Sequence, residues 1–599
     1  MKNTDWRDIH NGTPLPSESG YCDQPSIVAA QGNTLVGAIT TGTGDEGAFG
    51  EYVGIIRSDD GGRNWTKPQP LEDPRSESSY GVLIADASGR IYCFYCYNLE
   101  GVQESDGINR RDMGGRFCFR YSDDCGLSWS ARRIIPVRDF EIDRRYPILI
   151  RGKPYRMFWN VNAPFFDGDT LYIGLTKHHY GSFFRADYPY RNIEKTECVL
   201  LRCRGLARDP DAPWETLPEG EFGVRTPEGG GDVAEEPCFQ RLSDGTIFMI
   251  ARTNDGYPVC AYSRDGGRSF SRPFYPRHAS GLPIKNCRAV TVLWSLGGGR
   301  YLLWFHNIYR PGYGCRNPVW CCPAQEVPGE EGVELKFGNP EILFYHPSEQ
   351  ISINYPSFFL CDGKYYVSET QKRVARVHEL PKEFLDELFG LPRTVEAPDA
   401  FFEEGDTLSM ESQVYARLDS GVAEDWKCQT AGGTTFLFEF SGVCCGDTLF
   451  DTTAGEGGFR VSVTADGRLR CYAEGRKSNF VVESSVPVAG SAHHRAAWVT
   501  DGAARVSYLV IDGWFDNGGS RFAAGWKYVP LQTDEIVCGA KRPISHKLSY
   551  LAVCSRPLTS AKIAGLFEDI EKNQRRLGNE KTFRDLYDDS ALAVGGRLR

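Results

Sequence analysis

One eight-residue turn sequence occurs three times in this chain, and it constrains the fold more than any other feature. It reads SDDGGRNW at 58–65, SDDCGLSW at 122–129 and SRDGGRSF at 263–270. Each copy has a Ser, an Asp two residues later, a Gly two residues after that, and a final aromatic residue. We expect the Asp carboxylate to accept backbone N–H groups, the Gly to adopt a positive φ, and the aromatic ring to pack between sheets. The repeat therefore predicts a β protein built from similar hairpins.

Short apolar strands surround these turns and extend the pattern to most of the first 372 residues. The segments YVGIIR, FCFRY and VCAYS precede the three copies, and tight turns also occur in ASGRIYCFY, LSDGTIFMIAR, GGGRYLLWF and CDGKYYVSE. The 65 glycines and the 13% aromatic content are typical of many short strands joined by glycine-rich turns. The net charge of −11, spread without long runs, favours neither nucleic acid nor an anionic membrane as a partner.

The cysteines and the N-terminal segment bear on the cellular compartment. The first 20 residues contain no apolar core of a signal peptide, and no stretch reaches the ~18 apolar residues of a membrane span. The adjacent pairs Cys321-Cys322 and Cys444-Cys445 suit ordinary disulfide geometry poorly, and no zinc-type spacing occurs among the 20 cysteines. We therefore expect reduced thiols, a cytoplasmic protein and no bound metal. A secreted protein whose signal sequence had been removed would read the same.

The turns resemble the Asp boxes of the sialidase (neuraminidase) superfamily, whose fold is a six-bladed β-propeller. After a helical pattern in ARVHELPKEFLDELFG, segments such as TFLFEFSGV, GFRVSVTADGRLRCYAE and RVSYLVIDG alternate apolar and polar residues, which resembles a laminin-G or concanavalin-like jelly roll. The resemblance implies an all-β protein: a propeller over 1–380, a helical connector over 381–398, a β-sandwich over 399–575 and a tail over 576–599. LTSAKIAGLFEDIEKNQRRL predicts a helix capped by Thr559 or Ser560.

Sialidases differ from most glycosidases because a Tyr acts as the nucleophile, which avoids repulsion between an attacking carboxylate and the substrate carboxylate. A neighbouring carboxylate accepts the phenol proton, three arginines hold the substrate carboxylate, and a separate Asp is the general acid and base. The resemblance therefore implies a retaining exo-glycosidase that acts on a glycan or oligosaccharide and needs no cofactor.

The hairpin AEEPCFQRLSDGTIFMIAR resembles the sialidase segment that carries the activating Glu and the second arginine. Glu236 and Arg252 stand sixteen positions apart, which fits that segment. Because strand neighbours point to opposite faces, Glu235 is the alternative to Glu236.

Two later hairpins continue the resemblance. NCRAVTVLWSLGGGRYLLWF resembles the hairpin with the third arginine, at Arg288, and INYPSFFLCDGKYYVSETQK resembles the hairpin that opens with the nucleophile, at Tyr355. Glu369 falls near the late strand glutamate that orients an arginine in the family.

The first arginine of the family motif is missing. The family opens its first strand with Tyr-Arg-Ile-Pro, whereas this chain reads YCDQPSIVAA, with Asp23 or Cys22 at the arginine position and Gln24 beside it. A carboxylate there would repel a carboxylated sugar, so we expect Asp23 either to bind sugar hydroxyls or to serve as an acid or base. Gln24 is a second candidate for binding the sugar, and Arg316 is the candidate to replace the missing arginine.

The general acid is expected in the loop TTGTGDEGAFGEYVGIIRS that follows the first hairpin. Asp45 and Glu46 are equivalent candidates at this level, because both lie near the family spacing between flanking glycines. Both side chains could reach over a central pocket.

Three functional hypotheses follow from these residues. The first is a sialidase-type exo-glycosidase that releases a terminal sialic-acid-like or other acidic sugar. The second is a different carbohydrate-active enzyme, either a non-sialic exo-glycosidase or a polysaccharide lyase, that uses Asp23, the acidic loop and His306, with Asn307 nearby. The third is a non-catalytic glycan-binding protein. The density of Glu, Arg and Tyr at hairpin starts argues against the third hypothesis.

Overall fold

The computed structural model describes residues 5–18, 20–48, 50–110, 112–390, 400–402, 407–408, 433–453, 457–475, 478–530, 542–543, 545–554 and 556–577. The chain divides into two compact units: one is Ile9–Gly338 with Leu343–Lys382, and the other is mainly Glu383 onward. Both units are built from antiparallel strands, so the predicted all-β class is confirmed. None of the helices among the described residues has the length and hydropathy that a bilayer crossing requires.

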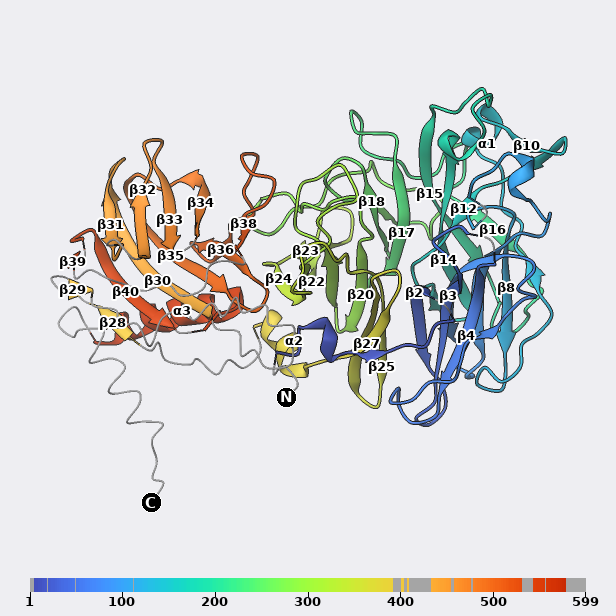
Figure 1. Cartoon of the computed structure of the whole chain (residues 1–599), viewed down its shortest axis with the longest axis horizontal. Helices are drawn as coiled ribbons and strands as arrows, with labels where there is room; N and C mark the ends of the chain where they lie inside the picture. Colours follow the sequence, from blue (N-terminus) through green and yellow to red (C-terminus); the bar gives the residue numbers. More distant parts are fainter. Residues whose placement is uncertain are drawn as a thin grey trace, which may run out of the picture. The chain divides into compact units, whose positions relative to one another are not determined.

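The first unit is a β-propeller with six antiparallel blades, as the resemblance implied (Figure 1). Blade one contains β2 (Gly20–Ala29), β3 (Leu35–Thr43), β4 (Tyr52–Ser58) and β5 (Gln69–Pro70). Blade two contains β6 (Ser78–Ala85), β7 (Ile91–Tyr97), β8 (Arg116–Ser122) and β9 (Arg133–Ile134). Blade three contains β12 (Phe158–Trp159) and β13 (Phe165–Asp167), which both pair with β14 (Thr170–Tyr180), and then β15 (Glu194–Cys203) and β16 (Trp214–Leu217).

The second half of the propeller follows the same order. Blade four contains β17 (Ala234–Arg241), β18 (Ile247–Thr253) and β19 (Val259–Ser263). Blade five contains β20 (Val292–Gly297), β21 (Arg300–Phe305), β22 (Val319–Pro328) and β23 (Val333–Phe337), with β24 (Glu341–Phe344) paired to β22. Blade six contains β25 (Asn354–Cys361), β26 (Lys364–Thr370), β27 (Ala375–Leu380) and the N-terminal β1 (Thr13–Pro14). Because β1 supplies the outer strand of blade six, an early segment of the chain closes the ring.

Helix α1 (Glu141–Arg145) and the hairpin of β10 (Ile148–Ile150) and β11 (Lys153–Tyr155) lie between blades two and three. The 3₁₀ turn η1 (Ile9–Asn11) precedes β1, η2 (Glu104–Asp106) lies between β7 and β8, and η3 (Gly181–Phe183) lies between β14 and β15.

Each repeated turn follows the third strand of a blade and is held by its own side chains. In the first copy Ser58 donates to Asp60 Oδ1 at 2.8 Å, and the Asn64 N–H donates to the same oxygen at 2.9 Å. The Gly62 N–H donates to the Ser58 hydroxyl at 2.8 Å, with a Gly62 φ of 88° that an L-side chain rarely adopts. The same Ser–Asp and Gly–Ser bonds recur in the turns at 122–129 and 263–270. We call each of these three octapeptides a hairpin clip, because its internal hydrogen bonds fix the turn that follows the strand.

Apolar layers join neighbouring blades. Between blades one and two, Val36 and Val53 belong to one buried cluster with Leu83 and Tyr95. Buried free thiols such as Cys93 take part in this packing as small apolar groups. This cluster packs blade one against blade two.

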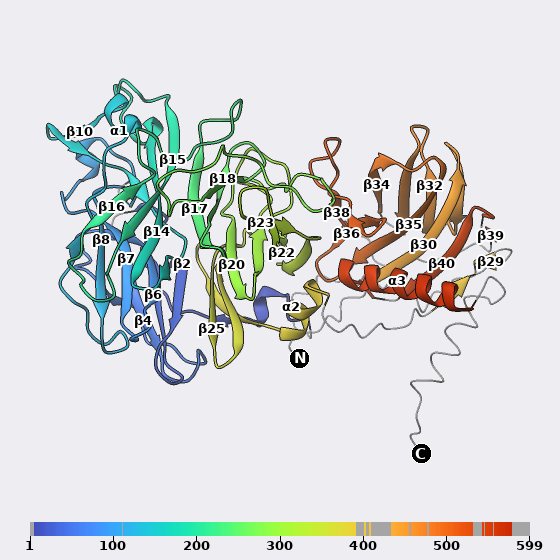
Figure 2. The same ribbon diagram turned by 180° about the vertical axis from the view of Figure 1, so that it is seen from behind.

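The second unit is a sandwich of two antiparallel sheets (Figure 2). One sheet contains β28 (Ala400–Phe402), β40 (Leu548–Cys554), β30 (Gly433–Val443), β35 (Gly490–Asp501), β36 (Val506–Ile511), β37 (Trp514–Phe515) and β38 (Trp526–Tyr528). The other contains β31 (Thr448–Asp451), β32 (Gly458–Val463), β33 (Arg468–Glu474) and β34 (Asn479–Pro487), and β29 (Thr407–Leu408) pairs with β39 (Arg542–Pro543). Phe436 and Trp498 of the first sheet share a core with Phe459 of the second.

One helix precedes the sandwich strands in the sequence and another follows them. Helix α3 (Ser560–Leu577) begins where the Lys562 N–H donates to the Thr559 hydroxyl at 3.3 Å, so Thr559 is the cap. Helix α2 spans Lys382–Leu388, whereas the preceding ARVHEL forms β27 and not the helical turn we expected. The reason is that blade six needs this strand to pair with β26. Residues 391–399 of the connector and 578–599 of the tail lie outside the described residues.

Candidate active site

Four inner strands carry the same local distortion, and three of the four distorted residues line one cavity. Gln24, Tyr80, Glu236 and Tyr355 have φ values of 47°, 59°, 54° and 48°, and each lies in a β-bulge of its blade. A bulge re-aims a side chain, and positive φ at a non-glycine residue is a cost that recurs at functional sites. A sequence signal accompanies the bulge, because Pro or Gly follows each residue in DQPS, SYGV, EEPC and NYPS.

A cavity of about 610 Å³ opens among these inner strands. Six of the residues that we predicted from the sequence line it: Glu46, Glu236, Arg252, Arg288, Arg316 and Tyr355. Seven do not: Asp23, Gln24, Asp45, Glu235, His306, Asn307 and Glu369. The cavity also contains residues that sequence reasoning missed, among them Tyr80, Arg110, Tyr180, Glu194, Tyr313 and Lys372.

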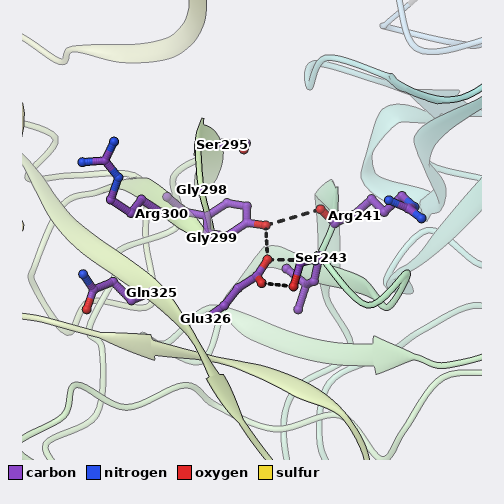
Figure 3. Close-up of a pocket in the computed structure, with 10 residues that line it drawn as sticks. Arg241, Ser243, Ser295, Gly298, Gly299, Arg300, Gln325 and Glu326 are labelled. Atoms are coloured by element: carbon purple, nitrogen blue, oxygen red, sulfur yellow. Dashed lines mark hydrogen bonds between the residues drawn. The ribbon is translucent and has the colours of Figure 1, made fainter.

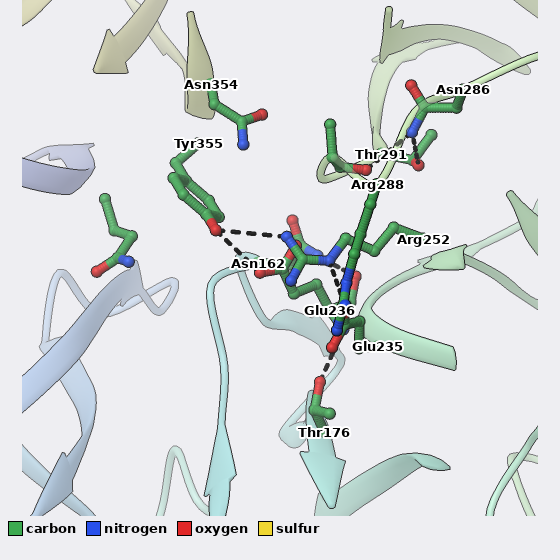
Figure 4. Close-up of polar contacts among 12 residues, drawn as sticks. Asn162, Thr176, Glu235, Glu236, Arg252, Asn286, Arg288, Thr291, Asn354 and Tyr355 are labelled. Carbon is green, nitrogen blue, oxygen red and sulfur yellow. Dashed lines mark hydrogen bonds and ion pairs between the residues drawn. The ribbon is translucent and has the colours of Figure 1, made fainter. Parts of the chain in front are cut away.

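Tyr355 and Glu236 both line the cavity, and their side chains point toward each other (Figure 4). The Tyr355 hydroxyl donates to Glu236 Oε1 at 3.2 Å, and Arg252 Nη1 lies 3.4 Å from that hydroxyl and 3.0 Å from Glu236 Oε2. Burial raises the pKa of Tyr355 to about 12. Burial also raises the pKa of Glu236, although Arg252 acts in the opposite direction. Tyr355 is therefore a neutral phenol at neutral pH with a carboxylate in position to accept its proton.

Glu235 lies beneath the cavity and holds two arginines. Its Oε1 accepts from Arg252 Nε at 2.7 Å and from Arg288 Nε at 3.0 Å, while Tyr180 donates to the other carboxylate oxygen. Although burial acts to raise it, these two guanidiniums hold the pKa of Glu235 at about 2. We expected Glu235 as an alternative substrate-binding residue. Its side chain is fully buried, and both of its oxygens already accept hydrogen bonds. Glu235 therefore orients the two arginines instead.

Arg316 differs from the other cations of the cavity. Its Nη2 donates to the Arg288 carbonyl at 2.5 Å, and its Nε has no hydrogen-bond partner. Within the described ranges no carboxylate lies at ion-pair distance from Arg316, although the residue is only 6% exposed. The exposed ring of Tyr313 lies 5.4 Å from its guanidinium and 4.7 Å from that of Arg288. A buried charge of this kind is stabilised by an anion, which makes Arg316 the candidate anion-binding group of the cavity.

Lys372 supplies a cation beside Asp23, the residue that stands where the family motif has its first arginine. Asp23 is fully buried, and its Oδ2 accepts from Lys372 Nζ at 2.6 Å, from the Tyr21 hydroxyl at 3.0 Å and from Gln24 Nε2 at 3.1 Å. Asp23 and Gln24 therefore lie behind the wall and do not reach the cavity, contrary to our expectation that they bind sugar hydroxyls. The physical reason is that a buried carboxylate is stable only beside a cation, and Lys372 supplies it.

The structure separates the two acids of the blade-one loop. The Asp45 side chain is 84% exposed and pairs with Arg373 at 2.5 Å, outside the cavity. Glu46 lines the cavity between Lys372 at 3.0 Å and Arg110 at 3.2 Å. Although burial acts to raise it, the pKa of Glu46 is lowered by these two cations. Glu46 is thus the loop acid within reach of a ligand.

Three further predicted residues are buried behind the cavity wall. His306 and Asn307 are fully buried, with His306 Nε2 3.5 Å from Asn354 Oδ1, and burial lowers the pKa of His306 to about 3. Glu369 Oε1 lies 3.2 Å from His378 Nε2 and 4.0 Å from the nearest nitrogen of Arg376. These side chains pack and support the strands, because none of them lines the cavity.

Tyr80 was missed because its segment contains no family motif. Its hydroxyl donates to Asp112 Oδ2 at 2.5 Å, and Arg110 Nη2 binds the same oxygen of Asp112 at 2.6 Å. The bulge signal SYGV was present in the sequence, whereas nothing local marked Lys372 or Arg110.

A larger hollow of about 760 Å³ lies at the turns of blades four and five (Figure 3). Three of its polar residues are paired with each other: Glu326 accepts from the Tyr301 hydroxyl at 2.7 Å and from the Ser243 N–H at 2.9 Å. No residue predicted for the site lines it. The smaller central cavity is therefore the candidate site.

Comparison with known proteins agrees with this architecture. Residues 33–326 match the family model described as a BNR repeat-like domain. No curated protein matches the chain. Among solved structures, a protein of unknown function from Dyadobacter fermentans is 14% identical, with a TM-score of 0.43, and covers 62% of this chain and 98% of its own.

Two sialidase structures are similar at the same low level. The intramolecular trans-sialidase of Ruminococcus gnavus is 13% identical, with a TM-score of 0.43 over 63% of this chain and 98% of its own. The Trypanosoma rangeli sialidase is 12% identical, with a TM-score of 0.40 over 94% of this chain and 97% of its own. The segment that matches the BNR repeat-like family is the part of the chain that carries the three copies of the hairpin clip, within the six-bladed propeller.

Proposed function

We propose that the central cavity is the active site of a retaining exo-glycosidase that releases a terminal acidic, sialic-acid-like sugar from a glycan. One observation carries the proposal: the Tyr355 hydroxyl lies 3.2 Å from Glu236 in a cavity that also contains the unpaired guanidinium of Arg316. The first feature supports a neutral nucleophile beside its base, and the second supports recognition of an anionic group.

The proposed reaction has two steps, with each group in the cavity given one role. Tyr355 attacks the anomeric carbon while Glu236 takes its proton, and the bond to the leaving oxygen breaks as Glu46 protonates that oxygen. Water, deprotonated by Glu46, then attacks the anomeric carbon of the tyrosyl–sugar intermediate. The bond between that carbon and the Tyr355 oxygen breaks, and Tyr355 regains its proton from Glu236. The neutral phenol suits this task, because a carboxylate nucleophile would repel an acidic substrate.

The acidic group of the substrate is assigned to the side of the cavity that carries the arginines. Arg316 has the free donors, and Arg252 and Arg288 are held in place by Glu235. A planar guanidinium pairs bidentately with a carboxylate, whereas the ammonium of Lys372 already faces Asp23 and Glu46. Binding of an acidic sugar would therefore neutralise Arg316 without displacing an existing ion pair.

The test uses aryl glycosides of several acidic sugars, including a fluorogenic sialoside and a uronide, with neutral aryl hexosides for comparison. We expect turnover of an acidic glycoside, loss of turnover in Tyr355→Phe, and unchanged turnover in Tyr366→Phe, whose ring packs in an apolar layer outside the cavity. An acidic sugar fluoride bearing a second fluorine should label Tyr355, which peptide mass spectrometry detects. Absence of turnover on every acidic glycoside would reject the proposal.

The missing first arginine supports a second candidate, a different carbohydrate-active enzyme with a non-sialic acidic substrate. A uronate hydrolase keeps the same roles for Tyr355 and Arg316. A polysaccharide lyase needs a base beside the C5 proton, and His306 is buried outside the cavity. Ultraviolet absorbance of an unsaturated uronate product, measured on a panel of acidic polysaccharides, distinguishes the lyase from the hydrolase.

A further inference from the structure

Lys372 has a constrained backbone in the turn between β26 and β27. Its φ is 72°, in the left-handed region that non-glycine residues rarely adopt. Its N–H donates to the Thr370 hydroxyl at 2.8 Å, and its carbonyl accepts from the Cys22 N–H at 3.0 Å. Such a conformation persists only where surrounding structure imposes it, and it is common at functional sites. These bonds place the start of the lysine side chain at the junction of blades six and one.

The ammonium of Lys372 contacts three groups at once. Nζ lies 2.6 Å from Asp23 Oδ2, 3.0 Å from Glu46 Oε2 and 4.7 Å from the centre of the Tyr355 ring. Asp23 is fully buried, whereas the Glu46 side chain is 31% exposed and lines the cavity. An ammonium has three rotatable donors, so it can serve two carboxylates and the face of a ring together, which the planar fork of an arginine cannot do.

We propose that Lys372 is a positioning residue that fixes the proton donor Glu46 relative to the nucleophile Tyr355, with Asp23 as its buried anchor. The inference rests on the proposed function, because it takes the roles of Glu46 and Tyr355 from there. The same inference explains the departure from the sialidase motif. Asp23 stands at the arginine position of the motif and binds Lys372, which lies near the other end of the propeller sequence.

A consequence concerns where the substrate carboxylate binds. Two of the three donors of Lys372 point to Asp23 and Glu46. The guanidinium of Arg110 on this side already binds Asp112 and Glu46, so no free guanidinium fork remains beside Lys372. The substrate carboxylate would then bind Arg316, with Arg252 nearby, on the side of Tyr355 away from Lys372. The acidic group of the preferred substrate is therefore rotated away from blade one and toward blade five.

The informative variant is the double substitution Asp23→Asn and Lys372→Met. It removes one charge of each sign and conserves volume, whereas Lys372→Met alone leaves a buried carboxylate without its partner. The matched control is Lys364→Met, which removes a lysine of the same hairpin that pairs with Glu379 and lies outside the cavity. We expect the double variant to lower kcat by about 10²-fold with a small change in KM, because a donor misplaced by about 1 Å costs that much. The control should retain wild-type kcat.

The pH profile provides a readout that a merely structural role would not move. The charged groups that face Glu46 are Lys372, Arg110, Asp112, Glu51 and Asp23. The double variant removes Lys372, which lies 3.0 Å from Glu46, and also the negative charge of Asp23. Because the ammonium is in direct contact with the carboxylate of Glu46, its loss outweighs that of Asp23, and the limb of the profile that depends on Glu46 should move to higher pH. A lower melting temperature with unchanged kcat and unchanged limbs would overturn the positioning role.

A crystal structure of the double variant tests the inference without any activity. Displacement of the Glu46 side chain from its place beside Tyr355 supports the role of Lys372, and an unmoved Glu46 rejects it. If the wild-type protein hydrolyses no acidic glycoside, the proposed function fails, while the structure of the variant still decides whether Lys372 holds Glu46. If the wild type is active and the variant matches it in kcat and pH profile, only the role of Lys372 fails.

Discussion

The hydroxyl oxygen of Tyr355 lies 3.2 Å from Oε1 of Glu236, although the two residues are 119 positions apart in the chain. The residues come from the bulged inner strands of blades six and four, and both have a positive φ. Two independently strained backbones thus converge on one hydrogen bond. Because strain of this kind is retained where it serves a site, the pair is the strongest basis for the predictions that follow.

Glu236→Gln should lower kcat/KM by about 10²–10⁴-fold, because it removes the base that takes the phenol proton. The amide has nearly the same volume as the carboxylate, so the melting temperature should change little. The measurement is steady-state hydrolysis of an aryl glycoside of the acidic sugar. Glu379→Gln is a matched control, because its side chain pairs with Lys364 near the surface and lies outside the cavity. Full activity in Glu236→Gln would mean that Tyr355 uses another base.

Arg316→Met should weaken binding of acidic sugars by about 10- to 150-fold, the value of a charge-assisted hydrogen bond of about 1.5–3 kcal/mol. The same variant should unfold at an equal or higher temperature, because it removes a buried cation that pairs with no carboxylate among the described residues. Arg288→Met should instead lower the melting temperature, because Arg288 compensates Glu235. Thermal unfolding and KM are measured on both variants. A large loss of stability in Arg316→Met would contradict the unpaired state of that residue.

The pH dependence of kcat/KM should be bell-shaped. Its acid break should reflect the proton donor Glu46, and its alkaline break should reflect the base Glu236, which is the reverse of the usual order. Glu236 must be ionised to accept a proton, yet burial raises its pKa; Glu46 must be protonated to donate, yet Lys372 and Arg110 outweigh burial and lower its pKa. Only a small fraction of the enzyme then has Glu236 ionised and Glu46 protonated at the same time. This fraction falls below the pKa of Glu46 and above the pKa of Glu236.

Glu46→Gln provides the check, with an aryl leaving group that needs no protonation. The requirement for a protonated Glu46 disappears, so the acid break should move up to the pKa of Glu236 and the alkaline fall should vanish. A variant profile in which only the alkaline limb shifts would show that Glu46 is not the donor.

Protonation of buried histidines should destabilise the propeller as the pH falls. Burial lowers the pKa of His278 to about 4, so below the unfolded value of about 6.5 the unfolded chain binds a proton that the folded chain does not. The stability contributed by neutral His278 is complete above pH of about 6.5 and should decrease by up to about 1.4 kcal/mol per pH unit between that value and about 4. The difference in unfolding free energy between wild type and His278→Gln, measured across this range, isolates the effect. A pH-independent difference would contradict it.

The hairpin clip should contribute to stability and not to catalysis. Asp265 accepts from the Ser263 hydroxyl at 2.8 Å and from the Ser269 N–H at 3.0 Å. Asp265→Ala should therefore lower the free energy of unfolding by about 1–3 kcal/mol through these lost bonds and leave kcat unchanged. Denaturant unfolding and aryl glycoside hydrolysis provide the two readouts, and a fall in kcat without loss of stability would be inconsistent with a purely structural turn.

Local patterns in the sequence were sufficient for the fold and for the centre of the site. The repeated octapeptide depends on bonds within eight residues, so its geometry could be read from its own letters. Glu236 and Arg252 belong to one hairpin, and their spacing follows from strand length alone. The bulge signal before Pro or Gly was also present and would have located Tyr80.

The charge pairing inside the cavity was decided only by the tertiary structure. Asp23 and Lys372 stand 349 residues apart, and no local pattern shows that closure of the ring brings them within 2.6 Å. The same closure directs Glu46 inward and Asp45 toward solvent, and it leaves Arg316 as the cation without a carboxylate in the described part of the cavity. The sequence alone determines which strands form and where they turn, because those preferences are local. Which buried charge meets which partner depends on the packing of distant blades, because electrostatic compensation acts through space.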